Sequence, residues 1–179
     1  MNNLIVFTGG PGSGKTTTIN HLIGMGYRSM AEVGRQVIQE QLKIGGKALP
    51  WDDKIAFRDE MVRKEVDNYN CQKCTDKLIF CDRSIIDSYG YSLLEGLPIS
   101  DELLGYCNQL KYHPKIFIFP PWKSIFENDD ERKQDFDEAV ATYQEMVSAY
   151  NKFEYSLVKV PKKSVEERVD FILEHINND

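Results

Sequence analysis

The sequence predicts an α/β fold, a three-layer α/β/α sandwich in which a parallel sheet of about five strands lies between helices. Three observations support this prediction. Short apolar runs alternate with helical patterns five times, glycine and proline residues separate the segments, and no repeat or linker divides the chain. With 179 residues the chain is long enough for one domain with its own core. We therefore predict a single domain over residues 1–179.

The expected strands are short runs rich in β-branched and aromatic residues. They span residues 3–7, 27–32, 77–81, 115–119 and 155–160. The first run ends in Gly9-Gly10, and Pro120-Pro121 stops the fourth. Ligands of parallel sheets bind outside the carboxyl ends of the strands. The residues that follow each strand are therefore the candidates for function.

Helical patterns follow the first two strands at residues 15–23 and 33–43. A third helix is expected from a cap at Asp52 to about residue 68, because apolar side chains recur on one face of this segment. Those side chains are Ile55, Val62, Val66 and Tyr69.

Four helices and a short lid are expected in the second half of the chain. Two helices begin with capping boxes, Ser84 with Asp87 and Ser164 with Glu167, and Ser100 caps another. The remaining helix is long and carries apolar side chains at helical spacing, namely Phe136, Val140, Tyr143, Val147 and Tyr150. A charged stretch before it places the lid at about residues 122–135.

Composition and charge exclude several classes of protein. The formal net charge is −6 and the pI is about 5.2, so we expect no duplex nucleic acid as a partner. No run approaches the roughly 18 apolar residues of a membrane span, and the N-terminus lacks a signal-peptide pattern. We expect a cytoplasmic monomer or homodimer without a membrane partner. Its cysteines are expected to be reduced thiols, although two form a C-x-x-C: Cys71, Cys74, Cys81 and Cys107.

The segment after the first strand fits G-x-x-x-x-G-K-[ST] at every fixed position. It reads Gly9, Gly10, Pro11, Gly12, Ser13, Gly14, Lys15 and Thr16, followed by Thr17. Such a loop turns its backbone N–H groups around phosphate oxygens, and the helix that follows adds the positive end of its dipole. We expect Lys15 to reach the β- and γ-phosphates and the Thr16 hydroxyl to bind Mg²⁺. The predicted cofactors are ATP and Mg²⁺, and ATP is favoured over GTP because no N-K-x-D guanine motif is present.

Asp82 ends the third apolar run and is the second candidate metal ligand. A carboxylate at this position orients Mg²⁺ in P-loop proteins. The next residue is Arg83, where motor-like ATPases usually have a glutamate that activates water, so the pair favours a kinase. In a kinase Asp82 would also orient the acceptor hydroxyl as a general base. The alternative is that Asp82 only caps the next helix.

Glu32 and Arg35 follow the second strand and share one face of the start of a helix. With Arg83 they are the candidate acceptor-binding residues. Glu32 would accept hydrogen bonds from hydroxyl groups, and Arg35 would hold an acidic group through two hydrogen bonds. The alternative for Glu32 and Arg35 is a surface ion pair.

Arg132 lies in the charged stretch and is the candidate lid cation. A phosphoryl-transfer site needs a cation over the migrating charge, but a run of charges is also typical of a solvated surface. Elsewhere, Trp51 could stack on a planar acceptor, and Pro161 and Val165 could contact a purine ring; core packing explains Trp51 equally well.

With these residues the chain resembles a family of small single-domain P-loop proteins, the AAA-type or predicted ATPases. The shared segments are Thr8–Thr16, Ala31–Arg35, Pro50-Trp51 with Asp53, Phe80–Arg83, Gly90-Tyr91, Gly96–Pro98, Pro120–Trp122 and Glu131–Phe136. The layout is also similar to nucleoside and nucleotide kinases, most of all to the nicotinamide riboside kinase domain of bifunctional NAD-biosynthesis proteins. The resemblance implies ATP-dependent phosphoryl transfer to a small acceptor rather than a hexameric remodelling machine.

The sequence thus favours a small-molecule kinase that phosphorylates a hydroxyl-bearing nucleoside, nucleotide or cofactor precursor. Lys15, Asp82 and Arg132 are its expected catalytic residues. Two alternatives stay open: a slow ATPase that acts as a switch, and a nucleotide- or partner-binding module without catalysis.

Overall fold

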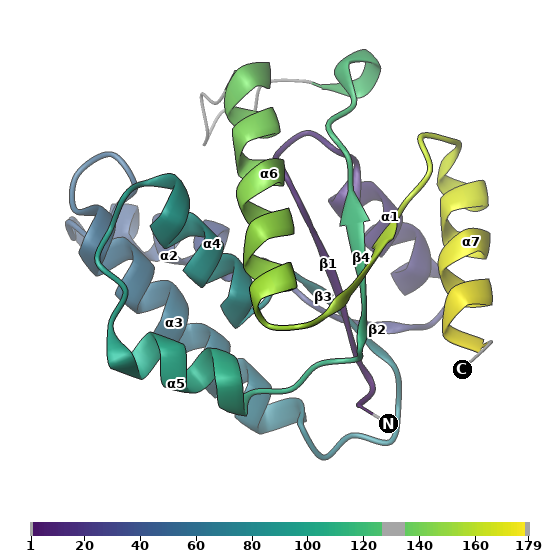
Figure 1. Ribbon diagram of the computed structural model, residues 1–179, viewed down its shortest axis with the longest axis horizontal. Coiled ribbons are helices and arrows are strands. Elements are labelled where there is room, and N and C mark those ends of the chain that lie inside the picture. The colour runs from purple at the N-terminus through teal and green to yellow at the C-terminus, as the bar shows by residue number, and fades with distance from the viewer. Residues whose placement is uncertain (1, 127–134, 178–179) are drawn as a thin grey trace.

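The sheet has the five parallel strands that the sequence predicts. The computed structural model describes residues 2–126 and 135–177. The strands are ordered β2-β3-β1-β4-β5, and every neighbouring pair is parallel. Figure 1 shows β1 and β4 running through the middle of the molecule. The strand bounds are β1 Leu4–Gly9, β2 Arg28–Met30, β3 Ile79–Asp82, β4 Lys115–Phe119 and β5 Ser156–Lys159.

Helices cover both faces of this sheet. In Figure 1, α1 and α7 lie on one side of the strands, while α2, α3, α4 and α5 form a group on the other side, next to α6. The helix bounds are α1 Lys15–Gly24, α2 Val33–Ile44, α3 Lys54–Gln72, α4 Ile85–Leu94, α5 Asp101–Gln109, α6 Phe136–Lys152 and α7 Val165–Asn177, with the short 3₁₀ helix η1 at Lys123–Ile125. The structure thus has the predicted three-layer α/β/α architecture.

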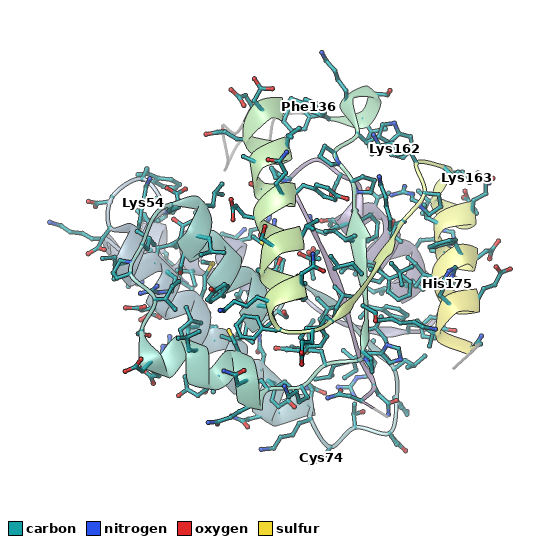
Figure 2. The ribbon with its side chains drawn as sticks, viewed as in Figure 1. Lys54, Cys74, Phe136, Lys162, Lys163 and His175 are labelled. Atoms are coloured by element: carbon teal, nitrogen blue, oxygen red, sulfur yellow. The ribbon has the colours of Figure 1, made fainter. Side chains whose placement is uncertain are left out.

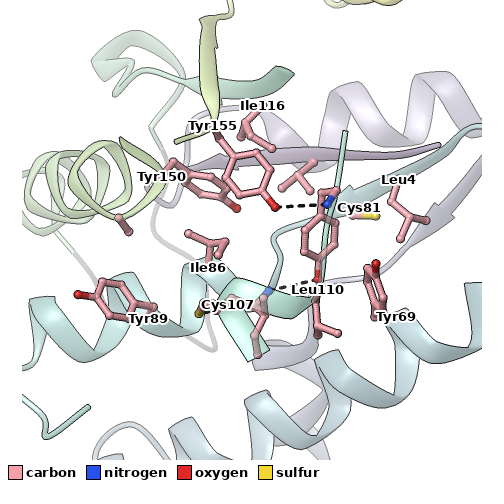
Figure 3. Packing of buried hydrophobic residues seen from close by; sticks show 14 of the residues in the cluster. Leu4, Tyr69, Cys81, Ile86, Tyr89, Cys107, Leu110, Ile116, Tyr150 and Tyr155 are labelled. Carbon is pink, nitrogen blue, oxygen red and sulfur yellow. Dashed lines mark hydrogen bonds between the residues drawn. The ribbon is translucent and has the colours of Figure 1, made fainter. Parts of the chain in front are cut away.

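Side chains of the central strand β1 belong to two separate hydrophobic cores, because successive side chains of a strand point to opposite faces of the sheet. Leu4 and Val6 belong to the cluster beneath α3, α4, α5 and α6, part of which Figure 3 shows. Ile5 and Phe7 belong to the cluster beneath α1 and α7. Each face of the sheet therefore anchors its own helices and leaves the carboxyl edge open.

The expected helix caps are mostly confirmed. Ser84 with Asp87 forms a capping box, Ser164 and Glu167 exchange the same pair of hydrogen bonds, and Ser100 caps α5. The cap expected at Asp52 is wrong, because the carboxylate of the next residue, Asp53, accepts the hydrogen bond from the Ala56 amide.

Two predicted helix faces also differ from the structure. Ile55 is 43% exposed rather than buried: it lies in the first turn of α3, which begins at Lys54, whereas Val62 and Tyr69 further along the same face are buried. On α6 the buried face is offset from the predicted one and consists of Ala139, Thr142, Met146, Ala149 and Tyr150. Small residues on this face allow close packing against neighbouring backbone: a Cβ on Gly10 would lie 2.3 Å from the Ala139 carbonyl oxygen. None of the helices in the described part of the chain is long and apolar enough to cross a membrane.

Candidate functional site

The loop between β1 and α1 has the conformation that its glycines permit. Gly9 has φ 126°, and a Cβ there would lie 2.4 Å from the carbonyl oxygen of Phe119 on β4. Only glycine tolerates this combination of positive φ and close backbone approach. Inside the loop, the Ser13 hydroxyl donates to the Gly10 carbonyl at 2.8 Å. The loop therefore closes on itself ahead of the N-terminus of α1, which begins at Lys15.

Lys15 is buried in this loop. Its Nζ donates to the carbonyl oxygens of Gly10 at 3.0 Å and Gly9 at 3.3 Å. Burial and the nearby Arg83 guanidinium lower the pKa of Lys15 to about 8. A phosphate group near Nζ would favour the charged form, because opposite charges raise the pKa of an amine. The side chain is thus held where an anion would stabilise it. Thr17 is exposed in the first turn of α1.

Thr16 and Asp82 bring two side-chain oxygens together at the edge shared by β1 and β3. The Thr16 Oγ1 lies 3.5 Å from the Asp82 Oδ2. The Asp82 Oδ1 is buried and has no hydrogen-bond partner in the described part of the chain. Burial raises the pKa of Asp82, and Lys15 opposes this shift. Mg²⁺ prefers oxygen ligands and is commonly held by one or two protein oxygens together with substrate phosphates. The Asp82 carboxylate fits this requirement, because Oδ2 lies beside Thr16 and Oδ1 has no partner among the described residues. Within residues 2–126 and 135–177 no cluster of three or more His, Cys, Asp or Glu offers a metal site made of protein ligands alone.

Arg83 connects the end of β3 to the start of α2. Its Nε donates to the Glu32 Oε1 at 3.0 Å, and its Nη1 donates to the Asp87 Oδ1 at 3.2 Å. The residue has φ 75°, a left-handed conformation that is uncommon outside glycine. Such strain is found at functional sites, where the surrounding structure holds it in place. Here the Arg83 amide also donates to the Phe7 carbonyl at 2.9 Å.

Asp87 is the centre of a buried network. Beyond Arg83, its carboxylate accepts hydrogen bonds from the Thr8 hydroxyl at 2.6 Å, the Tyr150 hydroxyl at 2.5 Å and the Ser84 amide at 3.0 Å. The donors come from β1, α6 and the start of α4. One carboxylate thus connects two helices to β1, the strand that leads into the glycine-rich loop at residues 9–16, which we call the phosphate loop. The sequence indicated only the capping bond to Ser84.

Asp87→Ala should destabilise the protein by about 3–5 kcal/mol, since it removes the carboxylate that accepts buried hydrogen bonds from Arg83 Nη1, the Thr8 hydroxyl and the Tyr150 hydroxyl. Urea denaturation measures this loss directly. The control is Asp170→Ala on the exposed side of α7, which should change the unfolding free energy by less than about 0.5 kcal/mol. Equal effects of the two substitutions would show that the Asp87 network contributes nothing to stability.

A cavity of about 580 Å³ opens beside the phosphate loop, between α2, α3, α4 and α6. Pro11, Glu32 and Arg83 line it where it meets the phosphate loop. Its exposed lining includes Trp51, which is 57% exposed, and the ion pair of Lys54 with Glu95. Figure 2 labels Lys54 on the outer side of the α2–α5 group and Phe136 at the end of α6 next to η1. Trp51 thus lies at the mouth of a cavity, as an acceptor-stacking role requires.

Glu65 is the functional candidate that sequence reasoning missed. It lines the cavity and is 3% exposed. Met61 and Phe57, one and two turns earlier on α3, are also buried and line the same cavity. A carboxylate four and eight residues after buried apolar positions is the signal that would have identified it, because residues at this spacing share a helix face. Burial, with Asp87, Asp82 and Glu32 nearby, raises the pKa of Glu65 to about 8.

This pKa makes folding stability depend on pH. The folded state holds the Glu65 proton more tightly than the unfolded chain does, where its pKa is near 4.5. The contribution of the group to stability is therefore complete below pH 4.5 and is lost as the pH rises through about 8. Relative to Glu65→Gln, the wild type should lose up to a few kcal/mol of unfolding free energy over this window, measured in urea without nucleotide or Mg²⁺. Parallel pH profiles for the two proteins would contradict this prediction.

The other residues predicted to form the site do not line the cavity or lie outside the described residues. Arg35 is half-buried on α2 and is not among the described residues that line the cavity. Arg132 and most of the predicted lid lie outside the described residues. Pro161 and Val165 are half-buried beside β5 and also do not line this cavity. Cys71 and Cys74 are exposed free thiols, and Cys81 and Cys107 are buried free thiols.

Arg168 makes a second contact that the sequence did not indicate: it binds the phosphate loop from α7. Arg168 on α7 is buried, and its Nη1 donates to the Gly14 carbonyl at 3.0 Å. Its guanidinium carbon lies 5.8 Å from the centre of the Trp122 ring, a cation–π distance. On the other side, a Cβ on Gly12 would lie 2.5 Å from the Phe126 ring. The segment after β4 therefore packs directly on the phosphate loop.

A family comparison matches most of the chain. The AAA domain family matches residues 4–168, and the chain belongs to this family. No curated protein sequence matches.

Several solved structures share the fold. Deoxyadenosine kinase from M. mycoides, with products dCMP and dCDP, has a TM-score of 0.72 and 13% identity, and the match covers 98% of this chain and 100% of that one. Thymidylate kinase from Candida albicans has a TM-score of 0.69 and 17% identity over 99% and 92% of the two chains. The NadR protein in complex with NR has a TM-score of 0.73 and 14% identity over 99% of this chain and 51% of that chain. The fold is that of the P-loop nucleoside and nucleotide kinases.

Proposed function

We propose that this member of the AAA domain family is a kinase that transfers the γ-phosphate of ATP to a hydroxyl group of a small molecule. The observation that carries the proposal is the adjacency of two sites at one edge of the sheet. The phosphate loop with Lys15 lies beside a cavity of about 580 Å³, and Glu32 and Arg83 line that cavity. A hydrolase needs room only for water, whereas this cavity can hold a molecule of drug-like size. The deoxyadenosine kinase and thymidylate kinase structures that share the fold support the same proposal.

Each residue then has a physical role. The amides of the loop and the Lys15 ammonium bind the β- and γ-phosphates of ATP. Thr16 and Asp82 would hold Mg²⁺, which neutralises phosphate charge when bound. Arg132, placed by the sequence in the lid, is proposed to neutralise charge that develops on the migrating phosphoryl group.

Glu32 is the better candidate for contact with the acceptor. Glu32 lines the cavity, whereas Asp82 lies next to Thr16 and is not among the described lining residues. In the transfer, the acceptor oxygen forms a bond to the γ-phosphorus while the bond from phosphorus to the β,γ-bridging oxygen breaks. The hydroxyl proton passes to the Glu32 carboxylate, and ADP leaves with the bridging oxygen. Arg83 keeps Glu32 in place through its 3.0 Å hydrogen bond.

The test is ADP release by the purified protein with ATP and Mg²⁺, alone and with a panel of nucleosides, nucleotides and hydroxyl-bearing cofactor precursors. A kinase should release ADP slowly alone and at least about tenfold faster with one acceptor. An unchanged slow rate with every compound would favour the alternative of a slow ATPase. ATP binding without any ADP release would favour a binding module.

A further inference from the structure

Glu65 is a buried carboxyl group that the proposed reaction does not use. It is 3% exposed and lines the cavity, yet within the described part of the chain its carboxyl group makes no hydrogen bond or ion pair. Burying such a group without a partner costs stability, roughly 1–3 kcal/mol for a neutral polar group. Structural carboxylates in this protein are satisfied instead, as Asp87 is by donors from three elements. The lack of a partner therefore suggests that Glu65 pairs with a ligand.

The groups that face Glu65 favour its neutral form. They are Asp82 and Cys81 on β3, Asp87 and Arg83 at α4, Glu32 before α2, and Tyr112 before β4. Burial raises the pKa of both the Cys81 thiol and the Tyr112 hydroxyl, so these two carry no charge at neutral pH. Three carboxylates against one guanidinium disfavour a further negative charge, and the pKa of Glu65 is raised to about 8. A neutral carboxyl group has an O–H to donate and a carbonyl oxygen to accept.

Among its described residues, the cavity lining holds no unpaired cation that would attract an anion. Its two cationic side chains among the described residues are both paired, Lys54 with Glu95 and Arg83 with Glu32 and Asp87. Glu138 adds another carboxylate to the lining. The walls between these charges are apolar and suit a ring: Phe57 and Tyr91 meet edge-to-face at 5.6 Å, with Met61 and Met146 alongside.

We propose that Glu65 is a specificity-determining residue that donates a hydrogen bond to a carbonyl or hydroxyl oxygen of an uncharged ring compound, and that the cavity selects such acceptors over their phosphate monoesters. This inference rests on the proposed function for the identity of the cavity as the acceptor site. Recognition by Glu65 precedes phosphoryl transfer, so binding can be measured apart from turnover.

The experiment measures binding by calorimetry without ATP or Mg²⁺. The probes are adenosine, cytidine, thymidine and uridine, each paired with its 5′-monophosphate. The wild type should bind at least one uncharged probe at least about tenfold more tightly than the monophosphate. Glu65→Gln, which keeps a donor and an acceptor, should stay within about threefold of the wild type. Glu65→Leu should weaken binding of the uncharged probe by about tenfold or more, equivalent to the loss of one hydrogen bond.

Thermal unfolding separates recognition from a structural role. Glu65→Leu should unfold at the same temperature as the wild type or higher, because it removes an unpartnered buried polar group. Glu60→Gln, on the same helix but away from the cavity lining, is the matched control; it removes a carboxylate that pairs with Arg63 at the surface and should keep both the affinity and the preference for the uncharged probe.

Four results would overturn the proposal: no binding of any uncharged probe, tighter binding of the monophosphates, equal losses in Glu65→Gln and Glu65→Leu, or a lower unfolding temperature for Glu65→Leu. Failure of the kinase assignment looks different. In that case an uncharged probe binds through Glu65 but gains no phosphate when ATP and Mg²⁺ are added.

Discussion

Lys15→Ala should lower the rate of ADP release by about 10³-fold or more while leaving the protein folded. Lys15 is the buried cation of the phosphate loop, and its ammonium is the group that would neutralise the γ-phosphoryl oxygens during transfer. The unfolding temperature should stay the same or rise, because burial lowers the pKa of Lys15 and its charged form is therefore destabilised in the protein without nucleotide.

The matched control is Lys163→Ala, which removes an exposed lysine that pairs with Glu167 on the surface of α7. It should leave both turnover and unfolding unchanged, since exposed ion pairs contribute little. Turnover at the wild-type rate in Lys15→Ala would contradict the assignment of the loop as a phosphate site.

Asp82→Asn should lower phosphoryl transfer by about 10²-fold and raise the Mg²⁺ concentration needed for half-maximal rate. The substitution keeps the shape of the side chain but removes the charge beside Thr16 that a divalent cation requires. Binding of ATP should remain largely intact, because the loop amides and Lys15 are unchanged. Rates are to be measured over a titration of Mg²⁺ with saturating acceptor.

Glu32→Gln is the informative comparison for this variant. It should also slow transfer, but without a change in the Mg²⁺ requirement, because Glu32 lines the acceptor cavity and pairs with Arg83. Near-normal rates for Asp82→Asn at all Mg²⁺ concentrations would leave Asp82 with only a structural role. A shifted Mg²⁺ requirement for Glu32→Gln alone would instead assign Mg²⁺ binding to Glu32 and contact with the acceptor to Asp82.

The sequence predicts the fold and the phosphate loop well because both depend on local signals. Four of the five expected strands deviate by one or two residues at each end, and the fourth has the bounds observed for β4. The loop motif lies between a strand and a helix, so its position in the fold could be predicted without tertiary information. The approach of Asp82 to Thr16 was likewise expected, since the two residues follow strands that pair in a parallel sheet.

The acceptor side of the site depends on contacts that no local pattern shows. Asp87 was expected only as a helix cap, because its donors Thr8 and Tyr150 are 79 and 63 residues away in the sequence. Glu65 was not recognised, since the apolar pattern of its helix indicates which positions are buried but not which of them face a cavity. Ile55 shows the same limit: its spacing fits a face on which Val62 and Tyr69 are buried, yet Ile55 lies in the first turn of the helix and is exposed.

The central claim is that the γ-phosphate of ATP moves to a hydroxyl group held in the cavity beside the phosphate loop. The most direct measurement follows the γ-phosphate itself, with ATP labelled at that position, Mg²⁺ and the acceptor panel, and identifies the labelled product by mass spectrometry. The label should appear on one uncharged hydroxyl compound, and Lys15→Ala should abolish this transfer. Label that appears only as inorganic phosphate, at a rate independent of every compound added, would contradict the claim.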